Sequence, residues 1–210
     1  MGMSALPALH LTPSDPDPEA PEDQRTLIVA ARFRDVMQAL GLDLEDPNLA
    51  GTPLRVARSY RELFAGLDPA TEPALRTFPN AEGYSQIVAV TDIRFHSLCA
   101  HHFLPFFGTA HVAYLPKDRV VGLSKLARVV EHYARRPQIQ ERLTEQVIEL
   151  LERRLRPAGA MVVVQARHMC MEMRGVGQPG ATTRTSAWRG AFADARTRQE
   201  FLDLLPKSAP

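Results

Sequence analysis

The spacing of apolar residues divides the chain into helical and extended stretches. From Gln24 to Leu40, apolar residues recur every three or four positions, which predicts a helix that stops at Gly41. A second helix is predicted to begin at Thr52, a good N-cap residue, and to close at Gly66. The N-terminal part of the chain is therefore expected to be helical.

Alternation of apolar and polar residues predicts strands farther along the chain. Such alternation occurs at 86–96, about 106–115 and 182–192, and a further strand is predicted for HMCMEMR at 168–174. Two helices are predicted between the second and third strands, one from Ser124 and one from Gln138 to about Leu155, and a last helix at 197–205. The order of strands and helices is therefore ββααββ, which predicts an α+β fold.

Composition narrows the class of protein without identifying it. The chain has 210 residues, 45% of them hydrophobic and 23% charged, with a formal net charge of +1. This balance gives no reason to expect nucleic acid or a membrane surface as a partner. There is no apolar run of the roughly 18 residues that a membrane span needs, and two cysteines suit a reducing compartment. A cytoplasmic protein is expected.

The chain also divides into segments of different character. Residues 1–23 contain five prolines and five acidic residues but no lysine or arginine, which predicts a disordered tail, with a docking peptide as the alternative. The helical segment at 24–80 follows, and a domain at 81–210 holds the predicted sheet.

The stretch SLCAHHFLPF concentrates groups that bind metal ions. It holds Cys99, His101 and His102, and the chain's other cysteine is Cys170. A thiolate and an imidazole spaced C-x2-H can bind one zinc ion, and a third protein ligand would leave one position for water, as in catalytic sites. Two alternatives stand beside this interpretation: the residues could be buried packing, or the two cysteines could form a disulfide.

The predicted strand at 168–174 strengthens the metal hypothesis. A period of two puts His168, Cys170, Glu172 and Arg174 on one face and three methionines on the other. The apolar face resembles a core, whereas the other carries too much polarity for a packed interior without a task.

Two pairs of cations are candidates for binding an anion. Arg55 and Arg58 lie three positions apart on the second predicted helix, where a solvated face is the alternative. Lys125 and Arg128 lie in the first turns of the helix that Ser124 is expected to cap. Cations are unfavourable at a helix N-terminus, so a bound anion would resolve the conflict, with simple solvation again the alternative.

Several motifs together resemble one family, type I GTP cyclohydrolase. They are CAHH at 99–102, GLSKLARVV at 122–130, RPQIQERLT at 136–144, HMC at 168–170 and RGVGQPGATTRTSAWRGAF at 174–192. The resemblance covers roughly residues 24–205. Two positions depart from the family pattern: Ala100 stands where Glu is common, and Arg58 replaces a usual Lys, which keeps the charge but changes the geometry.

The resemblance implies zinc-dependent hydrolysis of GTP at guanine C8, with release of formate and rearrangement of the ribose to give 7,8-dihydroneopterin triphosphate. It implies one Zn2+ per subunit. The implied roles are zinc binding for Cys99, His102 and Cys170, proton transfer for His101 and His168, a place near the ribose for Ser124, guanine binding for Gln140 and Glu141, and triphosphate binding for Lys125, Arg128, Arg174, Arg55 and Arg58. Glu141 suits guanine because a carboxylate accepts from N1–H and the 2-amino group together, which adenine cannot reproduce. Taken alone, however, Glu141 is also explained as a charge that suits a helix N-terminus.

The implied fold is the tunnelling fold, in which ββααββ units join edge to edge across subunits into a barrel, here in a homodecamer of two pentamers. Such closure would also pair the open edges of a four-stranded sheet. Glu141 is expected to bind guanine above the zinc of an adjacent subunit. Two other interpretations remain: a catalytically silent zinc module, and a different enzyme of this fold that acts on a pterin or deazapurine.

Overall fold

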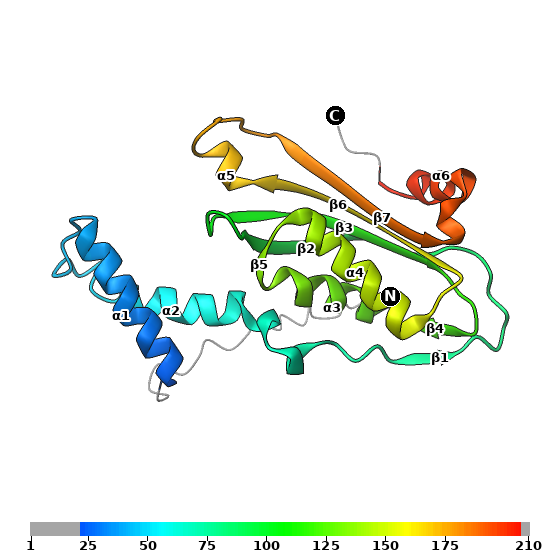
Figure 1. Ribbon diagram of the computed structural model, residues 1–210, viewed down its shortest axis with the longest axis horizontal. Coiled ribbons are helices and arrows are strands. Elements are labelled where there is room, and N and C mark those ends of the chain that lie inside the picture. Colours follow the sequence, from blue (N-terminus) through cyan, green and yellow to red (C-terminus); the bar gives the residue numbers. More distant parts are fainter. Residues whose placement is uncertain (1–21, 207–210) are drawn as a thin grey trace, which may run out of the picture. The chain divides into compact units, whose positions relative to one another are not determined.

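The computed structural model describes residues 22–206, and the chain divides into two compact units after Arg58 (Figure 1). The first unit contains α1 (Gln24–Ala39) and the start of α2 (Thr52–Leu63). The carboxylate of Asp23 caps α1 by accepting a hydrogen bond from the Thr26 amide. Gly41 follows α1 with a φ of 73°, which confirms it as the predicted stop. The tail predicted at 1–23 lies outside the described residues except for its last two positions.

The second unit is built on a five-stranded sheet in the order β5-β2-β3-β6-β7 (Figure 1). Its strands are β2 (Val88–Cys99), β3 (Pro105–Leu115), β5 (Pro137–Gln138), β6 (Gly159–His168) and β7 (Thr182–Gly190). The four long strands are antiparallel neighbours, and β5 pairs in parallel with the end of β2. The predicted α+β class is confirmed, and the ββααββ order holds with the third strand at Gly159–His168 instead of 168–174. The division at 24–80 and 81–210 stays a prediction.

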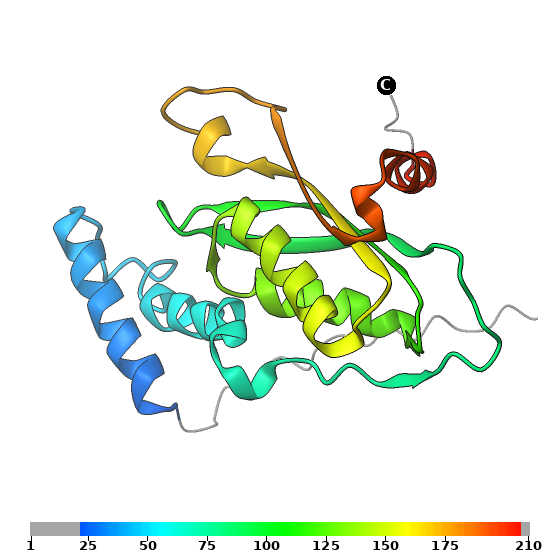
Figure 2. The same cartoon turned by 45° about the vertical axis from the view of Figure 1, so that its right-hand side comes forward.

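Two helices cover one face of this sheet, α3 (Leu123–Ala134) and α4 (Gln140–Leu155) (Figures 1 and 2). Their apolar stripes form the main core together with alternate strand residues such as Val112 and Val162. The intervening strand residues, such as Ala113, belong to a smaller cluster that contains Phe201 of α6 (Ala195–Asp203). The period of two along each strand thus separates two apolar layers.

Shorter elements complete the second unit. They are the 3-10 turns η1 (Ala65–Leu67), η2 (Pro69–Thr71) and η3 (Ala191–Ala193), the two-stranded sheet of β1 (Thr77–Pro79) and β4 (Arg119–Val121), and α5 (Met169–Glu172). Within residues 22–206, no helix has both the length and the apolar character needed to cross a bilayer.

The prediction of one strand through HMCMEMR is wrong beyond its first residue. β6 ends at His168, whose partner Phe106 is one residue from the start of β3, and Arg167 already pairs with the first residue of β7. Past His168 there is no strand left to accept backbone hydrogen bonds, so the chain coils into α5, where the Met173 amide donates to the carbonyl of Met169. Cys170, Glu172 and Arg174 therefore do not lie on one strand face.

Two predicted helix starts also need correction. α3 begins at Leu123 with Gly122 as its N-cap and no side-chain cap, so Ser124 is not a capping residue. α4 begins at Gln140 rather than Gln138, because Gln138 pairs with Cys99 in the sheet. Both helices start directly after a strand, β4 or β5. Strand pairing with a distant segment, which a local pattern does not contain, thus decides where each helix can begin.

Candidate active site

The loop between β2 and β3 folds tightly around Cys99. The Cys99 amide donates to the carbonyl of Leu104 at 2.8 Å, and the Phe103 amide donates to the carbonyl of Cys99 at 2.8 Å. Phe103 has a φ of 54°, an uncommon conformation for a residue other than glycine. The Ala100 amide donates to the carbonyl of Gln138 at 2.8 Å, which ties the loop to β5. The sequence CAHH is thus held as a turn that presents consecutive side chains at one place.

This turn gathers the predicted metal donors. The Sγ of Cys99 lies 3.7 Å from Nδ1 of His101, 3.8 Å from Nδ1 of His102 and 3.9 Å from Sγ of Cys170. Ligands of a tetrahedral zinc ion, with bonds of about 2.0–2.3 Å, are separated by about 3.5–3.8 Å. The donors therefore fit zinc in chemistry and in spacing. His101, which was expected to stay unligated, lies as close to Cys99 as His102 does, and all three donor atoms lie within 4.8 Å of one another.

Cys170 reaches the site from the first turn of α5. Both cysteines are free thiols, so the structure contains no disulfide between them. Burial raises the pKa of Cys170, and the neighbouring Cys99 thiol raises it further. Two adjacent thiolates repel each other in a partly buried place, and a bound cation is what would allow both to ionise at neutral pH.

His168 lies beside this cluster, at the end of β6. Its ring stacks on the buried ring of Phe106, with centroids 4.7 Å apart and an interplanar angle of 2°. Burial lowers the pKa of His168, and the charge of Glu141 opposes that shift. The imidazole is therefore uncharged at neutral pH. Sequence reasoning missed Phe106 as a partner of His168, because the β3–β6 register that places the two residues opposite each other is a tertiary pairing.

Gln140 connects His168 to the interior of β6 and to β7. Its Oε1 lies 2.8 Å from Nε2 of His168 and accepts the proton that this nitrogen carries. Its Nε2 donates to the carbonyl of Val164 at 3.1 Å, the carbonyl of Thr183 at 3.0 Å and Oγ1 of Thr185 at 3.2 Å. The residue is only 2% exposed. Its side-chain amide is thus satisfied within the chain and fixes the tautomer of His168.

Glu141 follows Gln140 and is exposed. Its charge acts on His168 of the same chain, so Glu141 lies near the site of its own subunit. The expectation that Glu141 binds guanine above the zinc of an adjacent subunit stays a prediction.

The predicted cations differ in where they lie: the charge of Arg174 acts on the Cys170 thiol, whereas the cations of α3 lie away from the donor cluster. α3 runs toward the cluster, because Ala134 at its C-terminal end accepts a hydrogen bond from Ser97 in β2. Ser124 precedes Ala134 by ten residues, which corresponds to about 15 Å of helix, so Ser124 and Lys125 lie at the distant end of α3. Arg128 lies one turn farther along α3 and is exposed.

The remaining cations lie in two places. Arg174 follows α5, two residues beyond its last position, and is exposed. Within residues 22–206, no carboxylate lies at ion-pair distance from Lys125, Arg128 or Arg174. Arg55 and Arg58 belong to the first unit, where Arg58 forms an ion pair with Glu22.

Comparison with known proteins decides the family. The profile described as GTP cyclohydrolase I matches residues 29–206 of this chain. The chain belongs to the GTP cyclohydrolase I family. GTP cyclohydrolase 1 of Rhodopirellula baltica is 50% identical over 202 residues, which cover 94% of this chain and 87% of that protein. GTP cyclohydrolase 1 of Thermobifida fusca is 51% identical, covering 82% of this chain and 84% of that protein.

Among solved structures, the archaeosine synthase QueF-Like in its apo form is similar to part of the chain. It covers 50% of this chain and 95% of its own, with 19% identity and a TM-score of 0.41. A likeness of this size supports no argument about the present chain. Membership of the GTP cyclohydrolase I family thus rests on the profile and the relatives.

Proposed function

We propose that this protein hydrolyses GTP at C8 of guanine, releases formate and rearranges the ribose to give 7,8-dihydroneopterin triphosphate, the first step of pterin and tetrahydrofolate synthesis. The observation that carries the proposal is the cluster of Cys99, His101, His102 and Cys170 beside a neutral, half-buried His168. Family membership over residues 29–206 supports it. We also propose that the enzyme works in the cytoplasm.

Cys99, His102 and Cys170 would hold one Zn2+ per subunit, with His101 left for proton transfer. The spacing of the donors from Cys99 supports a tetrahedral site, and both histidines are exposed. Bound zinc would supply a water whose pKa is lowered to about 7, a nucleophile strong enough for purine C8. Replacement of the cysteines by other donors would lose the soft ligands that zinc accepts.

His168 and His101 would move protons to and from the ring nitrogens. Gln140 holds the Nε2–H of His168, so Nδ1 is the nitrogen with a free lone pair that can accept a proton. We therefore propose that Gln140 positions His168 rather than binding guanine through its side-chain amide. Glu141, exposed and near His168, would accept from guanine N1–H and the 2-amino group.

Ser124 would act near the ribose, and Lys125, Arg128, Arg174, Arg55 and Arg58 would bind the triphosphate. Lys125, Arg128 and Arg174 have no acidic partner among the described residues, which leaves their charges available to an anion. Arg58 is already paired with Glu22, so phosphate binding there would require that ion pair to exchange.

The separation of these groups supports a shared active site. Ser124 and Lys125 lie about ten residues of helix away from the donor cluster of their own chain. A second subunit could bring the start of its α3 to the cluster if the sheets joined edge to edge, with β7 as one open edge. We propose the tunnelling fold for this assembly, in a homodecamer of two pentamers.

Incubation with GTP tests the function directly. The zinc-loaded protein is expected to release one formate per GTP and to give a pterin that fluoresces after oxidation. ATP is the matched control, since it lacks the N1–H and 2-amino donors. Release of phosphate or guanine without formate would overturn the proposal.

Mixed oligomers test the shared site. Cys99→Ser removes a metal donor, and Lys125→Glu reverses a charge at the distant end of α3, so each variant alone should be inactive. Co-refolded in equal amounts, they should recover about a quarter of the wild-type sites, because each site needs an intact residue from two different protomers. Verified mixed oligomers that stay inactive would refute a site shared in this way.

A further inference from the structure

A cavity of about 400 Å3 lies on the helical side of the second unit, among η1–η2, the end of α3 and the middle of α4. Its volume falls in the range of small-molecule sites. Leu67, Pro69 and Leu150 form an apolar part of its wall, and His132, Tyr133 and Arg136 form a polar part. None of these residues has a role in the proposed reaction.

Arg136 is the unusual member of this wall. Its guanidinium lies over the ring of Tyr133, 4.6 Å from the centroid, and its Nη2 donates to Nε2 of His132 at 2.6 Å. Its Nε is buried and has no hydrogen-bond partner. Among residues 22–206, no carboxylate lies at ion-pair distance from Arg136. The side chain is therefore held in one place while its charge stays uncompensated.

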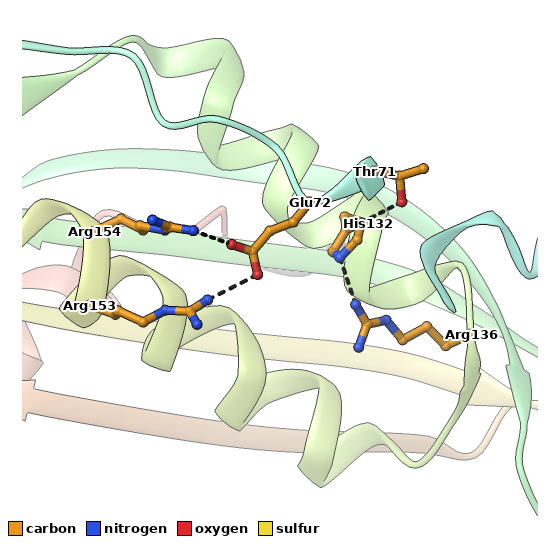
Figure 3. Close-up of polar contacts among 6 residues, drawn as sticks. All are labelled: Thr71, Glu72, His132, Arg136, Arg153 and Arg154. Carbon is orange, nitrogen blue, oxygen red and sulfur yellow. Dashed lines mark hydrogen bonds and ion pairs between the residues drawn. The ribbon is translucent and has the colours of Figure 1, made fainter. Parts of the chain in front are cut away.

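His132 cannot neutralise that charge. Since its Nε2 accepts from Arg136, its Nδ1 carries the proton and donates to Oγ1 of Thr71 at 3.2 Å (Figure 3). Oγ1 of Thr71 in turn donates to the carbonyl of Asp68 at 2.8 Å. Burial lowers the pKa of His132, and Arg136 lowers it further. The imidazole is a neutral support that fixes the guanidinium against η2.

Glu72 cannot neutralise Arg136 either. Its two carboxylate oxygens are already bound by Arg153 at 2.9 Å and Arg154 at 2.8 Å, as Figure 3 shows. Two arginines on one carboxylate leave that group with a net positive charge. Glu149, the remaining acidic residue of the wall, is exposed to solvent. The inner part of the cavity is thus positive, beside an apolar surface.

We propose that this cavity binds a small organic monoanion, a carboxylate on a flat or aliphatic body. The carboxylate would lie against the guanidinium of Arg136 and the hydroxyl of Tyr133, which has no hydrogen bond within the described chain. The body would cover the exposed wall residues Leu67 and Pro69. Glu149 disfavours ligands of higher negative charge, so a phosphate dianion is a poorer occupant than a carboxylate.

The wall of the cavity continues into the support of the metal-donor loop. Oγ of Ser97 donates to the carbonyl of Ala134 at 2.7 Å, and the Ala100 amide donates to the carbonyl of Gln138 at 2.8 Å. The Nε2 of Gln138 donates to Oε1 of Gln146, which lines the cavity, at 2.8 Å. A ligand that orders segment 134–138 would therefore also order the turn that carries Cys99.

Three probes test the site on the zinc-loaded oligomer: benzoate, neutral benzamide and inorganic phosphate. Benzoate should bind with a dissociation constant on the order of 1 mM. At 10 mM it should raise the melting temperature by about 3 °C. Benzamide should have no effect, and phosphate less than benzoate. Equal shifts with benzoate and benzamide, or a shift with phosphate alone, would overturn the proposal.

Substitutions in the cavity wall test whether benzoate binds in this cavity. Arg136→Gln should abolish the benzoate shift, whereas Arg135→Gln should keep it, because Arg135 pairs with Glu131 and does not line the cavity. Leu67→Asp adds an anion at an exposed wall position, where folding tolerates it, and should weaken benzoate binding at least about tenfold. An unchanged benzoate shift in both Arg136→Gln and Leu67→Asp would exclude this site.

Hydrogen exchange measures the link to the metal-donor loop. Benzoate should slow exchange at 134–138 and at the Ala100 amide, whose acceptor is Gln138. Bound benzoate with unchanged exchange at Ala100 would refute the link. None of these measurements uses GTP turnover, so they succeed or fail independently of the proposed catalytic function.

Discussion

Histidines occur in two contrasting settings within the second unit. His101 and His102 are exposed. Among the described residues, the Nδ1 atoms of His101 and His102 contact Sγ of Cys99 at 3.7 and 3.8 Å, respectively. His132 is 6% exposed and uses both ring nitrogens, one toward Arg136 and one toward Thr71. In the first setting the ring nitrogens face solvent and a thiol, whereas in the second both are hydrogen-bonded within the fold.

This difference separates a site that needs an external partner from a structural support. Imidazole nitrogens that meet only sulfur at nearly 4 Å gain little from the protein, and a metal ion would use them far better. His132 gains two hydrogen bonds inside the fold and would lose them by binding anything else. Hydrogen-bond satisfaction, more than residue type, marks which histidines are available for chemistry.

Removal of a metal donor should have the largest effect. Cys170→Ser should lose both bound zinc and turnover, because a hydroxyl is a poor zinc ligand at neutral pH. His101→Ala is the matched variant: it should keep zinc and lose about 10²- to 10⁴-fold in turnover as a proton-transfer residue. Zinc analysis of purified protein with a formate assay measures both. Stoichiometric zinc in Cys170→Ser, or loss of zinc in His101→Ala, would reverse the assignments.

The phosphate-binding cations should have the next largest effect. Lys125→Ala and Arg174→Ala should each bind GTP about ten- to a hundredfold more weakly, since a charge-assisted contact contributes about 1.5–3 kcal/mol. GMP and guanosine should be poor substrates of the unchanged enzyme. Titration with GTP, followed by turnover of GMP, measures this. Equal turnover of GMP and GTP would show that these cations serve another purpose.

Gln140 tests the same contrast between structural and chemical side chains, because it is a buried residue that orients the proton-transfer residue His168. Gln140→Ala should lower kcat about ten- to a hundredfold, as loss of a positioning contact does, with GTP affinity unchanged. Glu141→Gln is the control and should weaken GTP binding instead. If Gln140→Ala weakened GTP binding and left kcat intact, guanine binding would be its role after all.

His132 should give the smallest effect, on stability. Burial, and then Arg136, lower its pKa in the folded state, so the unfolded chain takes up the proton at higher pH than the folded chain. The contribution of His132 to the free energy of unfolding is therefore complete above the unfolded pKa of about 6.5. It is lost as pH falls through the lower folded pKa.

Melting temperatures at pH 7.5 and 5.5 measure this contribution. His132→Gln should reduce the loss of stability between the two pH values, whereas His96→Gln, at an exposed strand position, should leave it unchanged. An identical pH dependence in His132→Gln and the unchanged protein would contradict a neutral, supporting His132.

Local patterns were sufficient where the controlling interactions are local. The order ββααββ, the stop at Gly41 and the turn that carries Cys99 and His102 all follow from short-range periodicity and residue type. The proximity of Cys170 to Cys99 was also predicted, and the two thiols lie 3.9 Å apart. The family follows from motifs that stand in order along the chain.

Tertiary structure decided what depends on partners distant in sequence. The alternation in HMCMEMR predicted a strand, but β6 ends at His168 because neither β3 nor β7 extends to pair with the next residues. Gln140 was assigned to guanine, and only the fold brings His168, Val164 and Thr183 to its amide. The sequence by itself determined which groups can bind metal and transfer protons. Which of them remain unsatisfied was decided by the tertiary structure, because hydrogen-bond partners and strand edges come from segments that no local pattern contains.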